Sequence, residues 1–133
     1  DYVHFNGYCY KSFMDPKTRD EAKQTCAEDG GILAMPKDNA TNAFLANLAE
    51  VVWGRWLGLA DTNGDAQWVF EDGQPLTSSD YSSWLPGEPA PEDGQGGCVG
   101  FWEDGSSWDE KDCSGLRGFI CQINEGMCLD NSF

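Results

Sequence analysis

Six cysteines are the feature that most constrains the fold of this chain of 133 residues. An even number of widely spaced cysteines in a small chain, with no CxxC pair, is typical of a disulfide-stapled fold in an oxidising compartment. Six reduced thiols in a cytosolic protein are the less favoured alternative. Spacing alone does not choose among the possible pairings of Cys9, Cys26, Cys98, Cys113, Cys121 and Cys128.

Length predicts one domain over residues 1–133, and residues 124–133, which follow the last expected strand, are predicted to be a C-terminal extension. Hydrophobic residues make up 40% and aromatic residues 13%, which suits a folded globule and argues against disorder. No apolar run approaches the ~20 residues that span a bilayer, so we expect no membrane insertion. The chain opens at Asp1 on mature-looking sequence without a signal peptide, and together with the cysteines this predicts a secreted, extracellular protein.

The net charge of −15 is unevenly distributed. It argues against nucleic acid and against anionic membranes as partners, because both need a basic surface. Between Asp61 and Asp112 there are thirteen acidic residues and one basic residue, Lys111. A solvated acidic surface would explain this cluster. Carboxylates that converge on a cation would explain it as well, because the cation offsets their repulsion.

The first third of the chain predicts a hairpin and two helices. Aromatic and polar residues alternate around Asn-Gly in residues 2–13, which indicates a strand or hairpin. Residues 18–31 carry a capping box, Thr18 with Glu21, and end in two glycines. Residues 39–52 carry an apolar stripe at helical spacing, and either Asn39 or Thr41 could cap that helix.

From residue 56 onward, short apolar runs separated by turn residues predict strands. The runs are "RWLGLAD", "AQWVFEDG", "CVGFWEDG", "SSWDEKDC" and "GFICQIN". A proline- and glycine-rich stretch, "WLPGEPAPEDGQGGC", cannot form a regular helix or a central strand, and predicts a long loop over residues 76–97. Long loops in compact domains are usually functional or disordered. The fold class is therefore α+β.

Several of these segments together resemble the C-type lectin-like domain. "WLGL" at 56–59 resembles the family's WIGL signature, "GEPA" at 87–90 its EPN loop, "WDEKDC" at 108–113 its WND strand and "GFICQ" at 118–122 its FICE strand. "FNGYCY" at 5–10 resembles the family's first strand. The match covers residues 5–123. The resemblance implies a C-type lectin-like fold, with two helices flanking short antiparallel sheets and a long loop region.

The resemblance also implies disulfides. It pairs Cys26 with Cys121 and Cys98 with Cys113. Cys9 and Cys128 are left over, and adjacent termini favour a bridge between them. An interchain bridge through either thiol is the alternative.

In the family the long loop carries calcium, which binds six to eight oxygen ligands. Hydroxyl groups of the sugar complete this coordination shell. The resemblance places Glu88, Asp109 and Glu110 at the sugar-site calcium and puts Ala90 where the family has asparagine. For an auxiliary calcium site it offers Asp61 and Asp65, with Glu92 and Asp93 close to a further ligand position. Zinc is our second choice of metal, because carboxylates and water can also bind it.

These matches predict a secreted carbohydrate-binding module, linked to a divalent cation through the long loop, that recognises a glycan or a microbial surface polysaccharide in innate immunity. The expected ligand-binding residues are Glu88, Ala90, Trp102 and Asp109, and an exposed indole could stack on a sugar. The alternative is a protein-binding member of the family with a degenerate metal site. We expect no catalysis, since the only histidine, His4, lies in the first strand. "NAT" at 39–41 is also a possible N-glycosylation site at Asn39.

Overall fold

A β-hairpin opens the fold. The structure is a computed structural model that describes residues 1–48, 54–61, 63–89 and 97–129. Strands β1 (Val3–Phe5) and β2 (Tyr8–Lys17) pair antiparallel around Asn6 and Gly7, whose φ angles are 53° and 96°. Glycine and asparagine tolerate this left-handed backbone better than other residues, so the Asn-Gly pair fixes the turn as predicted.

Two helices follow, and both begin at a capping side chain. Helix α1 (Arg19–Glu28) begins with the expected capping box, in which Thr18 and Glu21 bond each other's backbone N–H groups. Helix α2 (Asn39–Ala46) begins after Asp38, whose carboxylate accepts the N–H of Thr41 at 2.7 Å. The predicted caps Asn39 and Thr41 are therefore wrong by one to three residues. The Asp38 side chain, on an extended backbone, thus accepts one of the backbone N–H groups that have no partner in the first turn of the helix.

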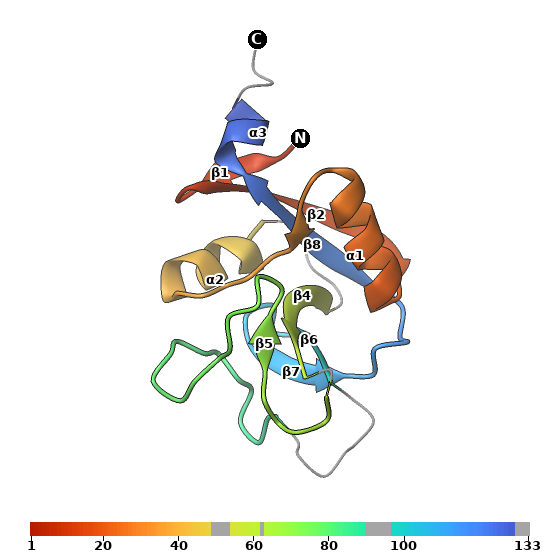
Figure 1. Ribbon diagram of the computed structural model, residues 1–133, viewed down its shortest axis with the longest axis vertical. Coiled ribbons are helices and arrows are strands. Elements are labelled where there is room, and N and C mark those ends of the chain that lie inside the picture. The colour runs from red at the N-terminus through yellow and green to blue at the C-terminus, as the bar shows by residue number, and fades with distance from the viewer. Residues whose placement is uncertain (49–53, 62, 90–96, 130–133) are drawn as a thin grey trace.

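One mixed sheet connects the rest of the chain. Strand β8 lies next to β2 and β3 through antiparallel pairs and next to β4 through a parallel pair. Figure 1 shows β2 and β8 crossing the upper half of the molecule, with β4, β6 and β7 below them. The remaining bounds are β3 (Ile32–Leu33), β4 (Arg55–Ala60), β5 (Val69–Phe70), β6 (Cys98–Phe101), β7 (Trp108–Lys111), β8 (Arg117–Asn124) and α3 (Glu125–Leu129).

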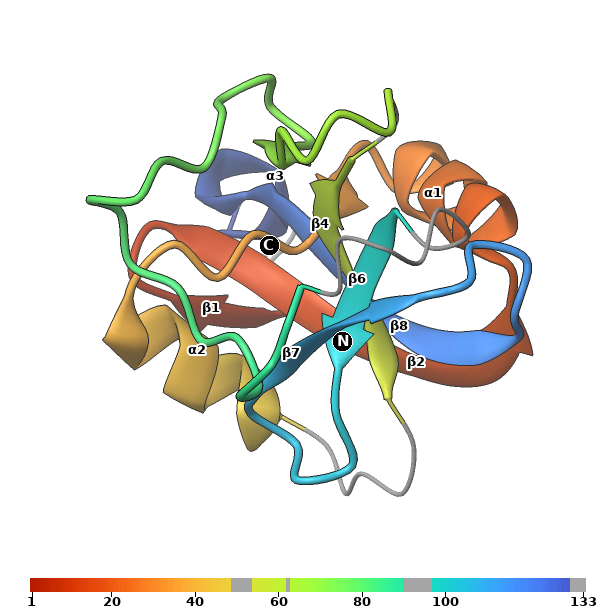
Figure 2. The ribbon, with the colours of Figure 1, turned by 90° about the horizontal axis from the view of Figure 1, so that it is seen from below.

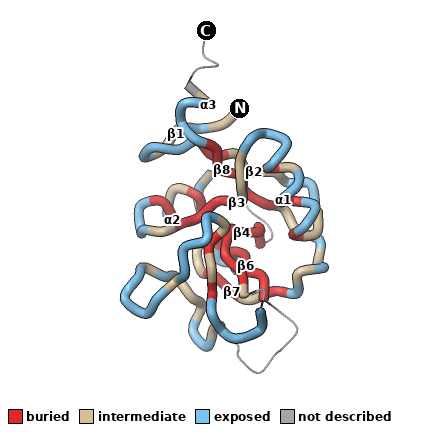
Figure 3. Tube along the Cα trace, viewed as in Figure 1, coloured by how far each residue is buried: buried red, intermediate tan, exposed pale blue. Residues whose placement is uncertain are grey.

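The core lies where β4, β6 and β8 meet. All six residues of β4 and all four of β6 are buried, and Figure 3 shows this buried centre with exposed connections below and to the left of it. Trp108 is fully buried, and its indole Nε1 donates to Asn42 Oδ1 of α2 at 2.8 Å. Trp56 is also fully buried and donates to the carbonyl of Lys17 at 2.9 Å. The two indole N–H groups thus have partners inside the protein, as buried donors require.

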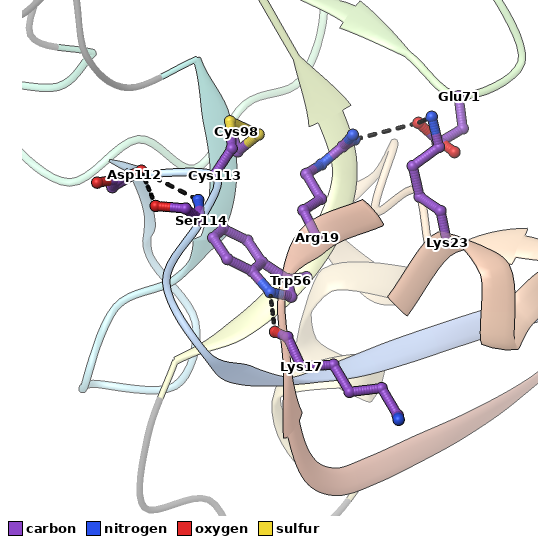
Figure 4. The surroundings of a disulfide bond; sticks show 9 residues. All are labelled: Lys17, Arg19, Lys23, Trp56, Glu71, Cys98, Asp112, Cys113 and Ser114. Atoms are coloured by element: carbon purple, nitrogen blue, oxygen red, sulfur yellow. Dashed lines mark hydrogen bonds and ion pairs between the residues drawn. A yellow bond between two sulfur atoms is a disulfide. The ribbon is translucent and has the colours of Figure 1, made fainter. Parts of the chain in front are cut away.

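Three disulfides staple the sheet to its surroundings: Cys9–Cys128, Cys26–Cys121 and Cys98–Cys113. These are the pairings that the resemblance and the adjacent termini implied, and Cys9 bonds within the chain. Figure 4 shows Cys98–Cys113 near Trp56, and beside them the ion pairs of Arg19 and Lys23 with Glu71 at 3.1 and 3.8 Å. The two cations tie α1 to the turn after β5.

Two features of the fold differ in detail from the expectation. The pair β4–β8 is parallel, whereas the predicted pairs were antiparallel. Helix α3 forms within the predicted extension 124–133, which Cys128 anchors to β2. In the described parts of the chain, no helix combines the length and the apolar character needed to cross a membrane.

Candidate functional site

Glu88 is held against β7 by the segment that precedes it. Trp108 donates its backbone N–H to the carbonyl of Ser83 at 2.7 Å, and Leu85 donates to the carbonyl of Trp108 at 2.8 Å. Glu88 Oε1 then accepts the backbone N–H of Glu110 at 3.0 Å, and the peptide bond after Glu88 is cis. The structure therefore brings the "GEPA" and "WDEKDC" segments together, although 22 residues separate Glu88 from Glu110.

Asp109 forms a buried ion pair on one face of β7. Side chains alternate along a strand, so Asp109 and Lys111 share one face while Trp108 and Glu110 share the other. The Nζ of Lys111 lies 2.7 Å from Oδ1 of Asp109, and their side chains are only 6% and 12% exposed. The ammonium group of Lys111 therefore occupies the place beside Asp109 Oδ1 that a metal ion would need.

Two glycines make room for the Lys111 side chain. A Cβ atom at Gly54 or at Gly100 would lie 2.9 Å from Cε of Lys111, closer than real Cβ contacts allow. The ammonium group also lies 5.9 Å from the ring centroid of Trp102, within cation–π range. This face of the β6–β7 hairpin is thus shaped around an internal cation.

Asp61 and Asp65 organise the turn after β4. Both oxygens of Asp61 accept backbone N–H groups, from Asp65 at 3.2 Å and from Ala66 at 2.7 Å. Asp65 in turn accepts the N–H of Gln67 at 3.0 Å, and the N–H of Asp61 donates to the carbonyl of Gly97 at 2.7 Å. The two residues predicted for the auxiliary calcium site are therefore close in space, but both carboxylates accept hydrogen bonds from backbone N–H groups of the turn.

The described residues do not fit a calcium ion as they stand. Calcium needs about six to eight oxygens. Within residues 1–48, 54–61, 63–89 and 97–129, no group of three or more His, Cys, Asp or Glu side chains is placed to hold a metal. The other expected positions, Ala90, Glu92 and Asp93, lie outside the described residues, so their part in a metal site stays a prediction.

Other carboxylates at this end of the molecule also bond to their own turns. Burial would raise the pKa of Asp104, but hydrogen bonds from Ser107 and Ser106 outweigh it and lower that pKa. The backbone and side chain of Thr77 lower the pKa of Asp80 in the same way. These two acids are therefore ionised turn residues, which accounts for part of the acidic cluster.

The tryptophans near the long loop divide into core and surface. Trp84 packs edge-on against Trp68 and Trp108, at centroid distances of 5.3 and 5.5 Å. Trp102 is 37% exposed. Of the two tryptophans that flank the long loop, Trp102 is thus the one able to stack on a ligand.

Asn39, the possible glycosylation site, and His4, the only histidine, lie elsewhere. Asn39 is exposed at the first turn of α2, so its glycosylation stays a prediction. His4 lies 2.6 Å from Glu125 of α3, at the upper end of Figure 1, whereas β7 lies at the lower end. Figure 2, seen from below, shows β7 in front and the segment from β5 running along it.

Sequence reasoning noted Lys111 only as the single basic residue of an acidic stretch. The signal that could have found its role is the spacing in "WDEKD". Residues two apart on a strand share a face, so the side chains of Asp109 and Lys111 can form an ion pair without any metal. Asn42, the partner of the Trp108 indole, carried no comparable signal because it comes from a helix 66 residues away.

Comparisons with known proteins agree with this architecture. The profile of the lectin C-type domain matches residues 15–123. Collectin-10 of Gallus gallus is 36% identical over 116 residues, which are 86% of this chain and 41% of that protein. The chain thus spans less than half of this longer relative. A C-type lectin of Cerberus rynchops is 34% identical over 129 residues, which are 91% of this chain and 80% of that protein.

A solved structure shows the same fold. The cow C-type carbohydrate-recognition domain of CD23, solved in the presence of GlcNAc2Man3 oligosaccharide, superposes with a TM-score of 0.82 at 30% identity and covers 92% of both chains. The profile match spans most of the sequence, and the disulfides and strand order described above accompany it. The chain belongs to the C-type lectin domain family.

Proposed function

We propose that this chain is a secreted carbohydrate-recognition module that binds glycans at the end carrying Glu88 and β7. Its relatives are named as lectins, and the cow CD23 domain was solved in the presence of an oligosaccharide. The three disulfides support an oxidising, extracellular location. A microbial surface polysaccharide, bound in innate immune recognition, is the ligand class we put forward first.

The observation that carries the proposal is the position of the Glu88 carboxylate. Its Oε1 is fixed by the N–H of Glu110, whereas Oε2 accepts no hydrogen bond from the described residues. A half-buried carboxylate oxygen of this kind accepts strongly from a hydroxyl group. Trp102 offers an exposed indole on the β6–β7 hairpin, to which the Glu88 carboxylate is bonded.

The cation expected from the sequence, calcium first and zinc second, has no role in this arrangement of the described residues. Lys111 already neutralises Asp109 at 2.7 Å, and Asp61 and Asp65 bond to backbone N–H groups. Direct hydrogen bonding to a glycan needs no metal. Binding measured with calcium, with zinc and with chelator decides the point.

Binding, and not catalysis, is the activity we propose. His4 pairs with Glu125 away from β7, and its cross-strand partner Cys9 is held in a disulfide. The alternative activity is recognition of a protein. The acidic surface favours it for a basic partner.

A glycan array probed with the intact chain, in calcium, in zinc and in chelator, tests the proposal. We expect saturable binding to at least one glycan class, weakened about tenfold by Glu88→Gln, the loss of one charge-assisted hydrogen bond. Glu103→Gln is the matched control, because Glu103 is an exposed glutamate on the same hairpin with no assigned role. No glycan binding in any metal condition, or equal binding by both variants, would overturn it.

A further inference from the structure

A groove lies away from β7, where the β1–β2 hairpin, β3 and the turn after β5 meet. Two openings of 290 and 180 Å³ share four lining residues, namely Tyr8, Met35, Asp72 and Gln122, and so form one continuous groove. Figure 3 shows β1, β3 and α2 around this region, above β7. We call it the side groove. Its volume is near the lower end of the roughly 300–1,000 Å³ typical of small-molecule sites.

Two polar groups from largely buried residues face the side groove without a hydrogen-bond partner among the described residues. Gln122 is 4% exposed, and its Oε1 accepts the N–H of Met35 at 2.9 Å. The Nε2 of the same amide donates to no atom of the described residues, and neither does the hydroxyl of Tyr10, which is 2% exposed. Neither atom is among the fully buried unpaired atoms of the described residues, so both donors are open to the groove and available to water or a ligand.

The rim supplies an acceptor, a second donor and an aromatic ring. Asp72 and Lys37 form an ion pair in which Lys37 also donates to Gln74 Oε1 at 2.6 Å. Burial would raise the pKa of Asp72, but the hydrogen bonds from Lys37 and Gln74 outweigh it and keep the carboxylate ionised. Tyr8 is 40% exposed beside them, so its ring is open to a ligand.

This set of groups selects one ligand chemistry. An apolar ligand would displace water from the donors of Gln122 and Tyr10 and leave them unsatisfied. An anion would meet the carboxylates of Asp38 and Asp72, both of which line the groove. A cation would compete with Lys37 for Asp72. Hydroxyl groups both donate and accept, and the apolar face of a pyranose can stack on the ring of Tyr8.

We propose that the side groove is a second, metal-independent binding site for one or two neutral sugar rings, with Gln122 and Tyr10 donating from its floor and Tyr8 stacking at its rim. This site is separate from the one near Glu88, so a glycan chain or two glycans could be held at two places on one molecule. The small volume excludes a folded protein partner from the groove itself.

Nuclear magnetic resonance of the isotopically labelled intact chain tests this site. Mannose, galactose, glucose and N-acetylglucosamine are titrated separately in the presence of chelator. We expect one of them to shift the side-chain amide of Gln122 and the backbone amide of Met35 saturably. Tyr8→Ala should weaken that binding about tenfold or more, whereas Met14→Ala, an exposed residue on the same strand, should not.

Gln122→Glu is the second variant, and its thermal unfolding checks that it is still folded. The carboxylate still accepts the N–H of Met35 but no longer donates, so we expect it to lose the sugar while its thermal unfolding stays cooperative. Sugar shifts confined to Trp102 and Glu110 would overturn the side groove and leave the proposed function standing. An absence of shifts at Gln122, or equal shifts in wild type and Tyr8→Ala, would also overturn it.

Discussion

Replacing Lys111 with methionine removes the one internal cation of the acidic half of the chain. Methionine keeps most of the length and volume of the lysine stem, so the cradle formed by Gly54 and Gly100 stays filled. The change therefore isolates the charge. After it, Asp109 keeps a buried carboxylate with no ammonium group at 2.7 Å.

The expected cost follows from the burial of both partners. With side chains 6% and 12% exposed, the pair belongs to the buried class, in which removal of one partner costs about 3–5 kcal/mol. An exposed pair would give only about 0–1 kcal/mol. Domains of this size are stable by roughly 5–15 kcal/mol, so Lys111→Met should lose a large part of the free energy of unfolding.

Urea unfolding followed by tryptophan fluorescence measures this loss, and Asp109→Asn and the double variant complete a cycle. We expect the double variant to be more stable than Lys111→Met, because removing the orphaned charge relieves the desolvation penalty. A Lys111→Met variant within about 0.5 kcal/mol of wild type would refute the reasoning, since that is the range of neutral surface changes. So would strictly additive effects in the cycle.

Three further predictions concern the Cys98–Cys113 disulfide, a buried hydrogen bond and the stability at acid pH. Replacing Cys98 and Cys113 together with serine should lower the free energy of unfolding by about 3 kcal/mol, read from the urea midpoint, because the bridge closes a loop with a sequence separation of 15. Trp108→Phe should cost about 1–3 kcal/mol in the same assay, since it leaves the Oδ1 of Asn42 without its buried donor; a cost near zero would argue against the bond. Because its pKa is lowered in the folded state, Asp104 contributes stability that is present above its usual value of 3.8 and lost as pH falls through the lower folded value. The stability gap between wild type and Asp104→Asn should therefore be constant near neutral pH and shrink below that value, and a gap that widens in acid would contradict the sign.

Local patterns predicted most of the fold because the signals lie within a few residues of each other. The Asn6-Gly7 turn, the Thr18–Glu21 capping box and each strand from β4 to β8 formed where the pattern indicated. Helix α3 was missed because five residues containing Gly126 carry neither periodicity nor a cap. The parallel β4–β8 pair was missed because alternation along a strand does not encode the direction of its neighbour.

The candidate site was harder to predict for a physical reason. The resemblance placed Glu88 and Glu110 together, and the structure joins them through a backbone hydrogen bond. The resemblance assigned Asp109 as a metal ligand, because a motif match compares residue types position by position and does not show which side chains are neighbours. The partner of Asp109 is decided by which side chains share a face of β7, and there Lys111 competes with any metal.

The positions of β1 and α3, at the end of the molecule away from β7, affect how several copies of the domain could bind one ligand together. Strand β1 and helix α3 lie side by side at the upper end of Figure 1, where Cys9–Cys128 ties α3 to β2, while β7 lies at the lower end. Copies attached side by side to a bead or a carrier at that upper end would all point Glu88 outward. Weak individual contacts with a repetitive polymer would then add up through raised local concentration, and attachment through the β7 end would abolish that gain.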